Sequence, residues 1–303
     1  MILVIVKVEL VFKKKIRKVK IKDRVYIVKA IRTSYWKPGH NYLNTIVNVL
    51  KTIKVKDYDI LFVSEKAIAT ARGCIIDEEK IEAGFLARII SRFWMRFVWG
   101  HVLGPLCGLR RETIAFLRKY PLDYGARHKE VALRYTGLLN ALCFGSEGGI
   151  DGSNLPYAYV CLPLSNAKEE VEELRKVVKR ELGVEVGVVL LDSDRCYDWK
   201  LFYVSPRSMS ITGIRSFGGF ITYVLSNFLK LKSYPTPVAA AGVDLNLREL
   251  LELAQAADKI RGHGAGRNVW EMAERFGTSL IGVTWDMLEK IPHYPLVVAR
   301  RVK

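Results

Sequence analysis

The segment from Ser165 to Asp192 constrains the fold most, because a clear helix pattern leads directly into the pattern of a buried strand. Apolar residues recur every three or four positions between 165 and 182, and glutamates crowd the first half, where a helix dipole favours negative charge. Gly183 supplies a helix stop, and the unbroken apolar run at 186–191 predicts a strand that ends in Asp192. The segment therefore predicts a helix joined to a strand by a short turn.

Helix and strand patterns alternate along most of the chain. Further helices are predicted at 41–50, 78–102, 112–119, 217–230, 247–261 and 269–276. Further strands are predicted at 2–12, 24–30, 58–63, 138–144, 157–162 and 294–302. This alternation predicts a mixed α/β architecture, and we assign the chain to the α+β class, with mixed sheets packed against helices.

The chain carries a formal net charge of +17, and much of the excess lies in the basic run at 13–22. Such a charge favours anionic partners, namely nucleotides, nucleic acid or an acidic lipid surface. For this run alone we favour a plainer interpretation, in which lysines protect the exposed edge of a sheet. Arg88, Arg92 and Arg96 fall on one face of a predicted helix, where they could bind phosphates or a partner, although a solvated face is the more frequent explanation.

The five cysteines are scattered, and none forms a CxxC pair. That spacing argues against a disulfide framework or a zinc site and favours a reducing cytoplasm. The apolar opening at 1–6 is too short to span a bilayer, and the uncharged stretch at 97–109 is interrupted by glycines and a proline. We therefore expect a cytoplasmic protein that has no membrane partner.

Two acidic residues follow apolar runs in a way that predicts a metal–phosphate site. Asp151 lies on the turn at 147–156 together with a hydroxyl and an amide, and Asp192 ends the apolar run at 186–191. Magnesium prefers oxygen ligands and is commonly held by one or two carboxylates plus phosphate oxygens. Ligands collect at strand ends in open sheets, so the two acids would meet there. Each acid also has a simpler explanation, since Asp151 suits a hairpin turn and Asp192 could cap the next element.

The other polar motifs add weaker indications. Arg195 follows Asp192 closely and would add a guanidinium group suited to phosphate. The glycine-rich loop at 262–266 could present backbone N–H groups to an anion, but it matches neither the dinucleotide nor the P-loop pattern. The five histidines lack the spacing of metal ligands, so we interpret them as structural.

Four stretches, in order along the chain, resemble one enzyme family. Residues 149–154 read GIDGSN and are similar to the GIDxSN signature of the coenzyme F420-0:L-glutamate ligase (γ-glutamyl ligase) family. Residues 186–193 read VGVVLLDS and resemble that family's VGVIITDT strand. Residues 59–66 and 294–300 are similar to its early and closing strands.

The resemblance implies domain limits and a reaction. It covers residues 25–303, so we expect a basic N-terminal strand or extension at 1–24 and a ligase-like domain of one or two lobes. In the family, the γ-phosphate of GTP activates a substrate carboxylate as an acyl phosphate, and the amine of L-glutamate then attacks to give an amide. The implied partners are GTP, L-glutamate, Mg²⁺ or Mn²⁺, and a phosphorylated carboxylate substrate such as coenzyme F420-0, bound by a homodimer.

The same resemblance assigns roles to single residues. Asp151 and Asp192 would be catalytic and would ligate the metal together with Ser193, which replaces the family's threonine. Asn154 would bind the nucleotide, and Lys66 would lie near its phosphates. Cations placed in this way would neutralise charge on the transferred phosphoryl group.

Several positions depart from the family pattern. Thr70 and Arg72 replace a lysine and an acid. The family's glycine–arginine pair is compressed to Asp194-Arg195, with Arg195 still expected to bind the nucleotide. Two alternatives follow: a nucleic-acid-binding protein that keeps only the fold, which the basic residues favour, or a non-catalytic relative, which the substitutions favour.

Overall fold

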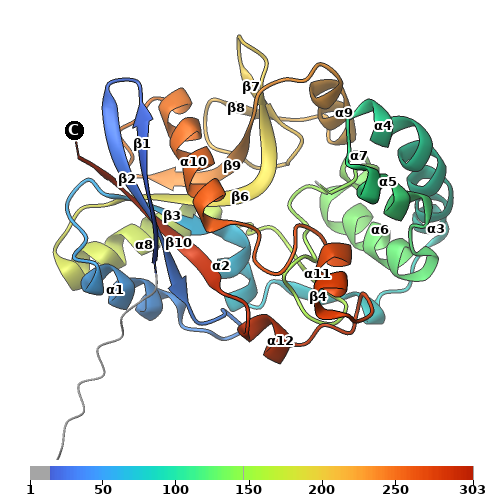
Figure 1. The fold of residues 1–303 in the computed structure, drawn as a ribbon, viewed down its shortest axis with the longest axis horizontal. Coiled ribbons are helices and arrows are strands. Elements are labelled where there is room, and N and C mark those ends of the chain that lie inside the picture. Colours follow the sequence, from blue (N-terminus) through green and yellow to red (C-terminus); the bar gives the residue numbers. More distant parts are fainter. Residues whose placement is uncertain (1–13, 146, 303) are drawn as a thin grey trace, which may run out of the picture.

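The computed structural model describes residues 14–145 and 147–302, so the strand expected at 2–12 lies outside the described residues. In the described part, an eight-stranded mixed sheet has the order β1-β2-β10-β3-β6-β7-β8, and β9 also pairs with β6 (Figure 1). Its strands are β1 (Lys14–Ile21), β2 (Arg24–Thr33), β3 (Ile60–Ser64), β6 (Gly187–Asp198), β7 (Tyr203–Ser205), β8 (Ile214–Ser216), β9 (Ser233–Ala241) and β10 (His293–Arg301). A two-stranded sheet pairs β4 (Ile75–Asp77) with β5 (Tyr159–Cys161).

Helices lie on and beside this sheet. They are α1 (Tyr42–Thr52), α2 (Glu65–Ala71), α3 (Phe85–Ile89), α4 (Gly104–Leu106), α5 (Arg111–Arg118), α6 (Leu122–Thr136), α7 (Leu138–Ala141), α8 (Ala167–Leu182), α9 (Phe220–Phe228), α10 (Leu247–Arg261), α11 (Val269–Phe276) and α12 (Trp285–Glu289). The 3₁₀ turn η1 (Glu78–Lys80) and the π-helical segment η2 (Ile90–Leu103) complete them. The α+β class expected from the sequence is confirmed.

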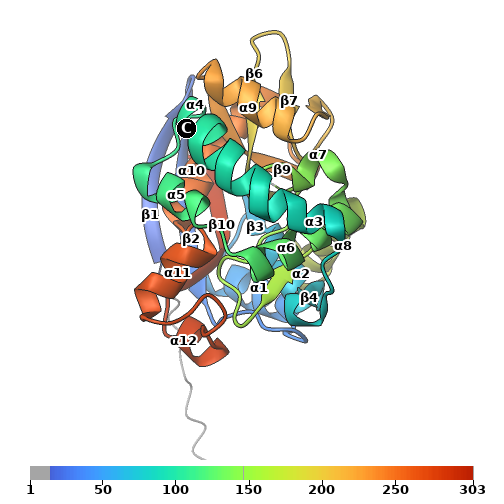
Figure 2. The same cartoon turned by 90° about the vertical axis from the view of Figure 1, so that its right-hand side faces the viewer.

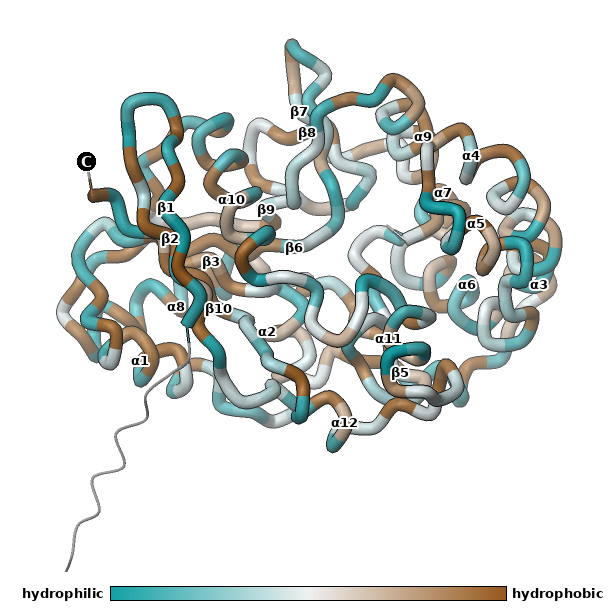
Figure 3. The backbone as a smooth tube through the Cα atoms, in the orientation of Figure 1, coloured by the Kyte–Doolittle hydropathy of each residue, from teal (hydrophilic) through white to brown (hydrophobic). Residues whose placement is uncertain are grey.

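Helices cover both faces of the sheet. Side chains of a strand point alternately to opposite faces, so one strand packs against helices on both sides. In β3, Leu61 and Val63 pack with α1, α2 and α8, whereas Ile60 and Phe62 pack with α10. A strand buried on both sides reads as a continuous apolar run. Figure 3 shows these central strands among the most hydrophobic parts of the chain.

A second group of helices lies beside the sheet, on the right of Figure 1 and facing the viewer in Figure 2. It contains α3, η2 and α4 to α7, and its own core includes Met95, Trp99, Leu117 and Tyr120. None of the helices in residues 14–145 and 147–302 is long and apolar enough to cross a membrane.

Within residues 14–145 and 147–302, the basic run forms the outermost strand of the sheet. β1 pairs antiparallel with β2 on one side, and Lys14, Lys15 and Lys18 are exposed. The interpretation of this run as a lysine-protected sheet edge is therefore confirmed.

Two predicted strands need correction. The strand predicted at 138–144 is wrong, because the chain forms α7 there after Gly137, whose φ of 82° ends α6 and starts a new turn. A short apolar run cannot by itself distinguish a strand from a buried helical turn. The strand predicted to end at Asp192 instead continues to Asp198, with a shift of register against β9 between Asp192 and Arg195.

Most predicted helices are confirmed with shifted ends. The helix predicted at 78–102 begins as a 3₁₀ turn, is interrupted at 81–84, and resumes as α3 and η2. Helix α8 ends at Gly183 in the left-handed conformation (φ 69°), as the sequence predicted.

Candidate active site

Lys66 lies in the first turn of α2, directly after β3, and its ammonium group reaches the turn that carries Asp151. It lies 2.5 Å from the Asp151 carboxylate and 2.9 Å from both the carbonyl and the hydroxyl oxygen of Ser153. β3 and β6 are parallel neighbours in which Ser64 aligns with Leu191. Their carboxyl ends therefore bring Lys66 and Asp192 to the same edge of the sheet.

The geometry of its own turn fixes Asp151. Its Oδ1 accepts a hydrogen bond from the Ser153 amide at 2.7 Å, and its backbone pairs in both directions with Cys161. Asp151 thus lies beside a local turn closed by its own side chain, and its other carboxylate oxygen contacts Lys66.

Asn154 joins this turn to the glycine-rich loop at 262–266. Its backbone is left-handed (φ 58°), a conformation that asparagine tolerates better than most residues. Its Oδ1 accepts from the Ala265 amide at 2.5 Å, and its Nδ2 donates to the carbonyls of His263 and Gly266 at 3.2 and 3.0 Å. The amide of Asn154 therefore holds the loop against the site.

Arg207, a buried arginine that no sequence motif indicated, connects the second acid to this turn. Its guanidinium forms ion pairs with Asp192 and, at 2.7 Å, with Glu65. It also packs against Gly149, where a Cβ atom would collide with it. Burial opposes its charge, but Glu65 and Asp192 raise the pKa of Arg207. Arg207 thus places Asp192 beside the glycine turn that leads into Asp151.

Two adjacent pockets open around these residues. The Lys66 pocket, of about 120 Å³, is lined by Lys66, Asp192 and the glycine-rich loop. The His128 pocket, of about 330 Å³, is lined by His128 and Asp151. Four residues line both pockets: Ser153, Ser193, His263 and Arg267. The two acids predicted from the sequence therefore lie on either side of a shared boundary.

The two pockets differ in chemistry. Three cationic side chains, Lys66, Arg261 and Arg267, line the Lys66 pocket together with two acids, Asp192 and Asp258. Six aromatic rings line the His128 pocket together with several acidic side chains; the rings belong to Tyr120, Tyr124, Phe144, Tyr157, Tyr159 and Trp270. Such a cavity suits a ligand with a flat apolar body, whereas its neighbour suits an anion.

A buried ionic cluster forms one wall of the larger pocket. His128 Nδ1 lies 2.6 Å from Glu78, and its Nε2 contacts Glu147, which also pairs with the fully buried Lys129. Burial opposes the charge of the imidazole, but Glu147 and Glu78 raise the pKa of His128 to about 10. Burial also opposes the charge of Glu147, but His128 and Lys129 lower its pKa to about 2. His128 was interpreted as structural, and this pairing gives it a charge at the pocket wall.

Arg195 is the one predicted site residue that the structure does not bring to the pockets. Its guanidinium turns to α10, where it donates to Gln255 at 2.7 Å, and to the Ser233 carbonyl at 3.1 Å. The positions that depart from the family pattern also have structural contacts. Thr70 donates to the Lys66 carbonyl, and Arg72 forms an ion pair with the buried Glu170 at 2.7 Å.

The oxygen donors at the pocket boundary suit a hard divalent cation whose coordination is completed by a ligand. Among the described residues, no three His, Cys, Asp or Glu side chains form a metal cage. Asp151 and Asp192 nevertheless supply two carboxylates, and Ser193 lies exposed between the pockets. One or two carboxylates plus phosphate oxygens are the usual ligands of Mg²⁺ in nucleotide sites. The residues present therefore fit a metal that binds together with a phosphate group.

Comparison with known proteins agrees with the motifs. The family model described as F420-0:gamma-glutamyl ligase matches residues 30–264. The chain is also 36% identical to an uncharacterized protein of Methanocaldococcus jannaschii over 281 residues, which covers 89% of this chain and 94% of the relative. A match over most of the chain, including both motifs that carry the two acids, shows that this protein belongs to the F420-0:gamma-glutamyl ligase family.

Proposed function

We propose that this chain is a GTP- and divalent-metal-dependent ligase that joins a carboxylate substrate, such as coenzyme F420-0, to L-glutamate through an acyl phosphate. One observation carries the proposal: two pockets of different chemistry share a boundary at Ser153 and Ser193, with Asp151 lining one and Asp192 the other. A ligase of this type must hold a triphosphate next to a carboxylate, and adjacent cationic and aromatic pockets support that arrangement.

The Lys66 pocket is the proposed site of the GTP phosphates. Lys66 and Arg267 supply positive charge, and the glycine-rich loop at 262–266 lies on the same wall. Asn154 holds that loop in place through its side-chain amide. Because these groups are fixed before the ligand arrives, they would stabilise charge on a phosphoryl group at little reorganisation cost.

A divalent cation, Mg²⁺ or Mn²⁺, is proposed to bind at Asp151, Asp192 and Ser193. When bound, it would neutralise the charge of the phosphate oxygens. In the structure Lys66 pairs with Asp151, and Arg207 is shared between Asp192 and Glu65. Lys66 is thus positioned either to balance the acid or to bind a phosphate oxygen.

The carboxylate substrate is proposed to occupy the His128 pocket. A carboxylate oxygen attacks the γ-phosphorus of GTP, the bond to the β-phosphate oxygen breaks, and GDP leaves. The amine nitrogen of L-glutamate then attacks the acyl carbon, inorganic phosphate leaves, and the amine loses a proton. The products are an amide, GDP and phosphate. The charged His128–Glu147 pair holds this wall of the pocket in a fixed geometry.

The cellular setting and assembly follow from the same proposal. All five cysteines are free, as expected in the reducing cytoplasm where GTP is abundant. We extend the proposal to a homodimer, as the family resemblance implies. Sedimentation velocity of the purified chain tests this, since a monomer at all concentrations would contradict it.

Isothermal titration with Mn²⁺ and GTP tests the proposed site. We expect Asp151→Asn and Asp192→Asn each to weaken Mn–GTP binding by about tenfold or more, since each removes a charge from the metal site. The exposed acid Asp286 offers a matched control, because Asp286→Asn should bind like the natural sequence. Unchanged affinity in both site variants would remove the basis of the proposal.

Turnover separates the two alternatives. Formation of GDP and phosphate that requires both L-glutamate and a carboxylate substrate would exclude a non-catalytic relative. The nucleic-acid alternative is motivated by the net charge of +17 and by Arg88, Arg92 and Arg96. That alternative predicts salt-dependent retention of RNA or DNA in a filter-binding assay, and no retention at low salt would exclude it.

A further inference from the structure

One long stretch of the helical group contains no acidic residue. From Ala83 to Arg111 the sequence has no aspartate or glutamate, whereas it has Arg88, Arg92 and Arg96 in its first half. The stretch includes α3, η2 and α4 and lies on the right-hand side of Figure 1, away from the sheet.

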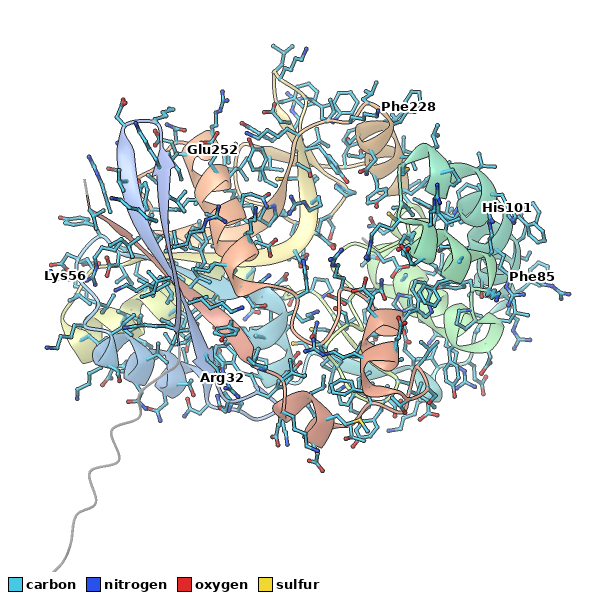
Figure 4. The ribbon with its side chains drawn as sticks, viewed as in Figure 1. Arg32, Lys56, Phe85, His101, Phe228 and Glu252 are labelled. Atoms are coloured by element: carbon cyan, nitrogen blue, oxygen red, sulfur yellow. The ribbon has the colours of Figure 1, made fainter. Side chains whose placement is uncertain are left out.

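A row of large apolar side chains projects from this stretch into solvent. Phe85 is 81% exposed, Phe93 58% and Phe97 57%, and these residues recur with helical spacing. The rings of Phe93 and Phe97 lie 5.7 Å apart, and that of Phe97 stacks on His101. Figure 4 shows Phe85 and His101 at the outer edge of the molecule. Monomeric proteins seldom expose a continuous row of this kind without a partner.

The arginines lie beside these rings. Arg88 and Arg92 are exposed, and Arg96 is half-buried and donates from Nε to the Tyr120 carbonyl at 2.8 Å. The exposed face therefore combines apolar rings with positive charge. That combination is typical of helices that lie in the interface of an anionic membrane, where the rings enter the headgroup region and the cations meet phosphates.

The opposite face of the same helix is anchored to the core of the helical group. Met95 and Trp99 are fully buried, and the indole nitrogens of Trp94 and Trp99 both donate to the Leu142 carbonyl at 2.8 Å. Because these residues hold the helix, the exposed phenylalanines do not contribute to the core.

Neighbouring elements extend the apolar surface. Helix α9 contacts both α4 and α7, and Figure 2 shows these elements on the same side of the molecule as η2. Their exposed apolar side chains include Leu106, Leu138, Leu139, Ile221, Leu225 and Phe228. Figure 4 labels Phe228, the last residue of α9, near the top of the molecule. The surface is therefore broader than one helix.

We propose that this face, which we call the phenylalanine–arginine face (Phe85, Phe93, Phe97, Arg88 and Arg92), binds the surface of an anionic lipid bilayer. The occupant follows from charge. In a two-fold dimer through the same face, each arginine would need an acid on the facing copy, and residues 83–111 contain none to supply it. An anionic bilayer combines an apolar interior for the rings with negatively charged headgroups for the arginines. The protein would lie on the membrane without crossing it, contrary to the expectation that it has no membrane partner.

The proposal is independent of the ligase activity, because none of these five residues lines the Lys66 pocket or the His128 pocket. Flotation of the full chain with lipid vesicles tests it. We expect the protein to float with vesicles of phosphatidylcholine and phosphatidylglycerol, and not with phosphatidylcholine alone. Raising the salt concentration should release it, since exposed charges are screened within about 8 Å at physiological ionic strength.

Two variants separate the apolar and the charged contributions. Phe93→Ser combined with Phe97→Ser should lower the partition coefficient by about tenfold or more, because both rings leave the interface. Arg88→Gln combined with Arg92→Gln should abolish the preference for anionic vesicles. The control is Tyr58→Ser combined with Leu201→Ser, which removes two even more exposed apolar side chains elsewhere and should bind like the natural sequence.

Three results would overturn the proposal. The natural sequence could fail to float with anionic vesicles at low salt, or the Phe93/Phe97 variant could float as well as the control. Sedimentation velocity could show that the same variant converts a dimer into a monomer while vesicle binding is absent, which would assign the face to a second copy. Circular dichroism checks that each variant is folded, and the arginine variant provides an independent test if the phenylalanine variant does not fold.

Discussion

Lys66 and Asp151 form an ion pair at the boundary of the two pockets, although 85 residues separate them in the chain. The same ammonium group also contacts both the carbonyl and the hydroxyl oxygen of Ser153. The ammonium group is thus a cation in contact with three oxygen atoms, as a metal ion bound at this position would be. Lys66 and a divalent metal would therefore compete for Asp151.

This competition makes Lys66→Gln informative. Removing the ammonium group should strengthen binding of Mn²⁺ alone, because Asp151 loses its competing cation. The same change should weaken binding of GTP with Mn²⁺ by about 1.5–3 kcal/mol, roughly tenfold to a hundredfold, because a charged contact to phosphate is lost. Isothermal titration of each ligand measures both effects, with the exposed Lys176→Gln as control. If both affinities fall together, Lys66 and the metal do not share Asp151.

Arg207 is predicted to be required for folding as well as for the site. Arg207→Met would leave the buried Glu65 and the partly buried Asp192 without their shared partner, and breaking a buried ion pair costs about 3–5 kcal/mol. Urea unfolding followed by tryptophan fluorescence measures the loss. The exposed Arg180→Met on α8 should change stability by no more than about 0.5 kcal/mol. An Arg207→Met protein as stable as the natural sequence would contradict the prediction that folding depends on this ion pair.

The His128 cluster predicts how stability depends on pH. Burial opposes its charge, but Glu147 and Glu78 raise the pKa of His128 from its ordinary value of 6.5 to about 10. A raised pKa means that its stabilisation is complete below pH 6.5 and is lost as the pH rises through about 10. The free energy of unfolding should therefore fall over this range, and His128→Gln should flatten the fall.

Denaturant unfolding at a series of pH values measures that slope. The exposed His101→Gln is the matched control and should keep the slope of the natural sequence. An equal slope in the His128 and His101 variants would contradict the assignment. Glu147 predicts a loss of stability at low pH. Its pKa is lowered from 4.5 to about 2, so its contribution to the free energy of unfolding is lost as the pH falls from 4.5 towards 2.

Asn154 is predicted to hold the glycine-rich loop at 262–266 in place. Asn154→Gly removes its hydrogen bonds to Ala265 and Gly266 without backbone strain, because glycine tolerates the left-handed conformation. Hydrogen exchange of the loop should become faster, with a stability loss of about 1–2 kcal/mol. Lys54→Gly, also at a positive φ, is the control and should leave the loop protected. Unchanged exchange in the Asn154 variant would mean that other contacts fix the loop.

Local patterns predicted much of the fold. Helix α8 and the start of β6 follow from an apolar stripe, a glycine stop and an apolar run, all of which act within a few residues. The strand predicted at 138–144 is wrong because its short apolar run carries no period, and the left-handed Gly137 decides the structure instead. The continuation of β6 past Asp192 depends on pairing with β9, which lies some forty residues further along the chain.

The site was predictable only where its residues belong to motifs. Lys66, Asp151 and Asp192 lie on turns and strand ends that resemble the family signatures. Arg207 and Glu65 were missed, because a buried ion pair between residues 142 positions apart leaves no local signal. Arg195 was expected at the nucleotide from its distance along the chain, but the register shift in β6 turns its side chain towards α10.

Anomalous diffraction from a crystal grown with GTP and Mn²⁺ tests the central claim most directly, because manganese can be located without assuming a ligand pose. We expect a manganese peak in contact with carboxylate oxygens of both Asp151 and Asp192, with the GTP phosphates in the Lys66 pocket. Manganese and nucleotide bound elsewhere, with Lys66 still paired with Asp151 and Arg207 still paired with Asp192, would contradict the proposal.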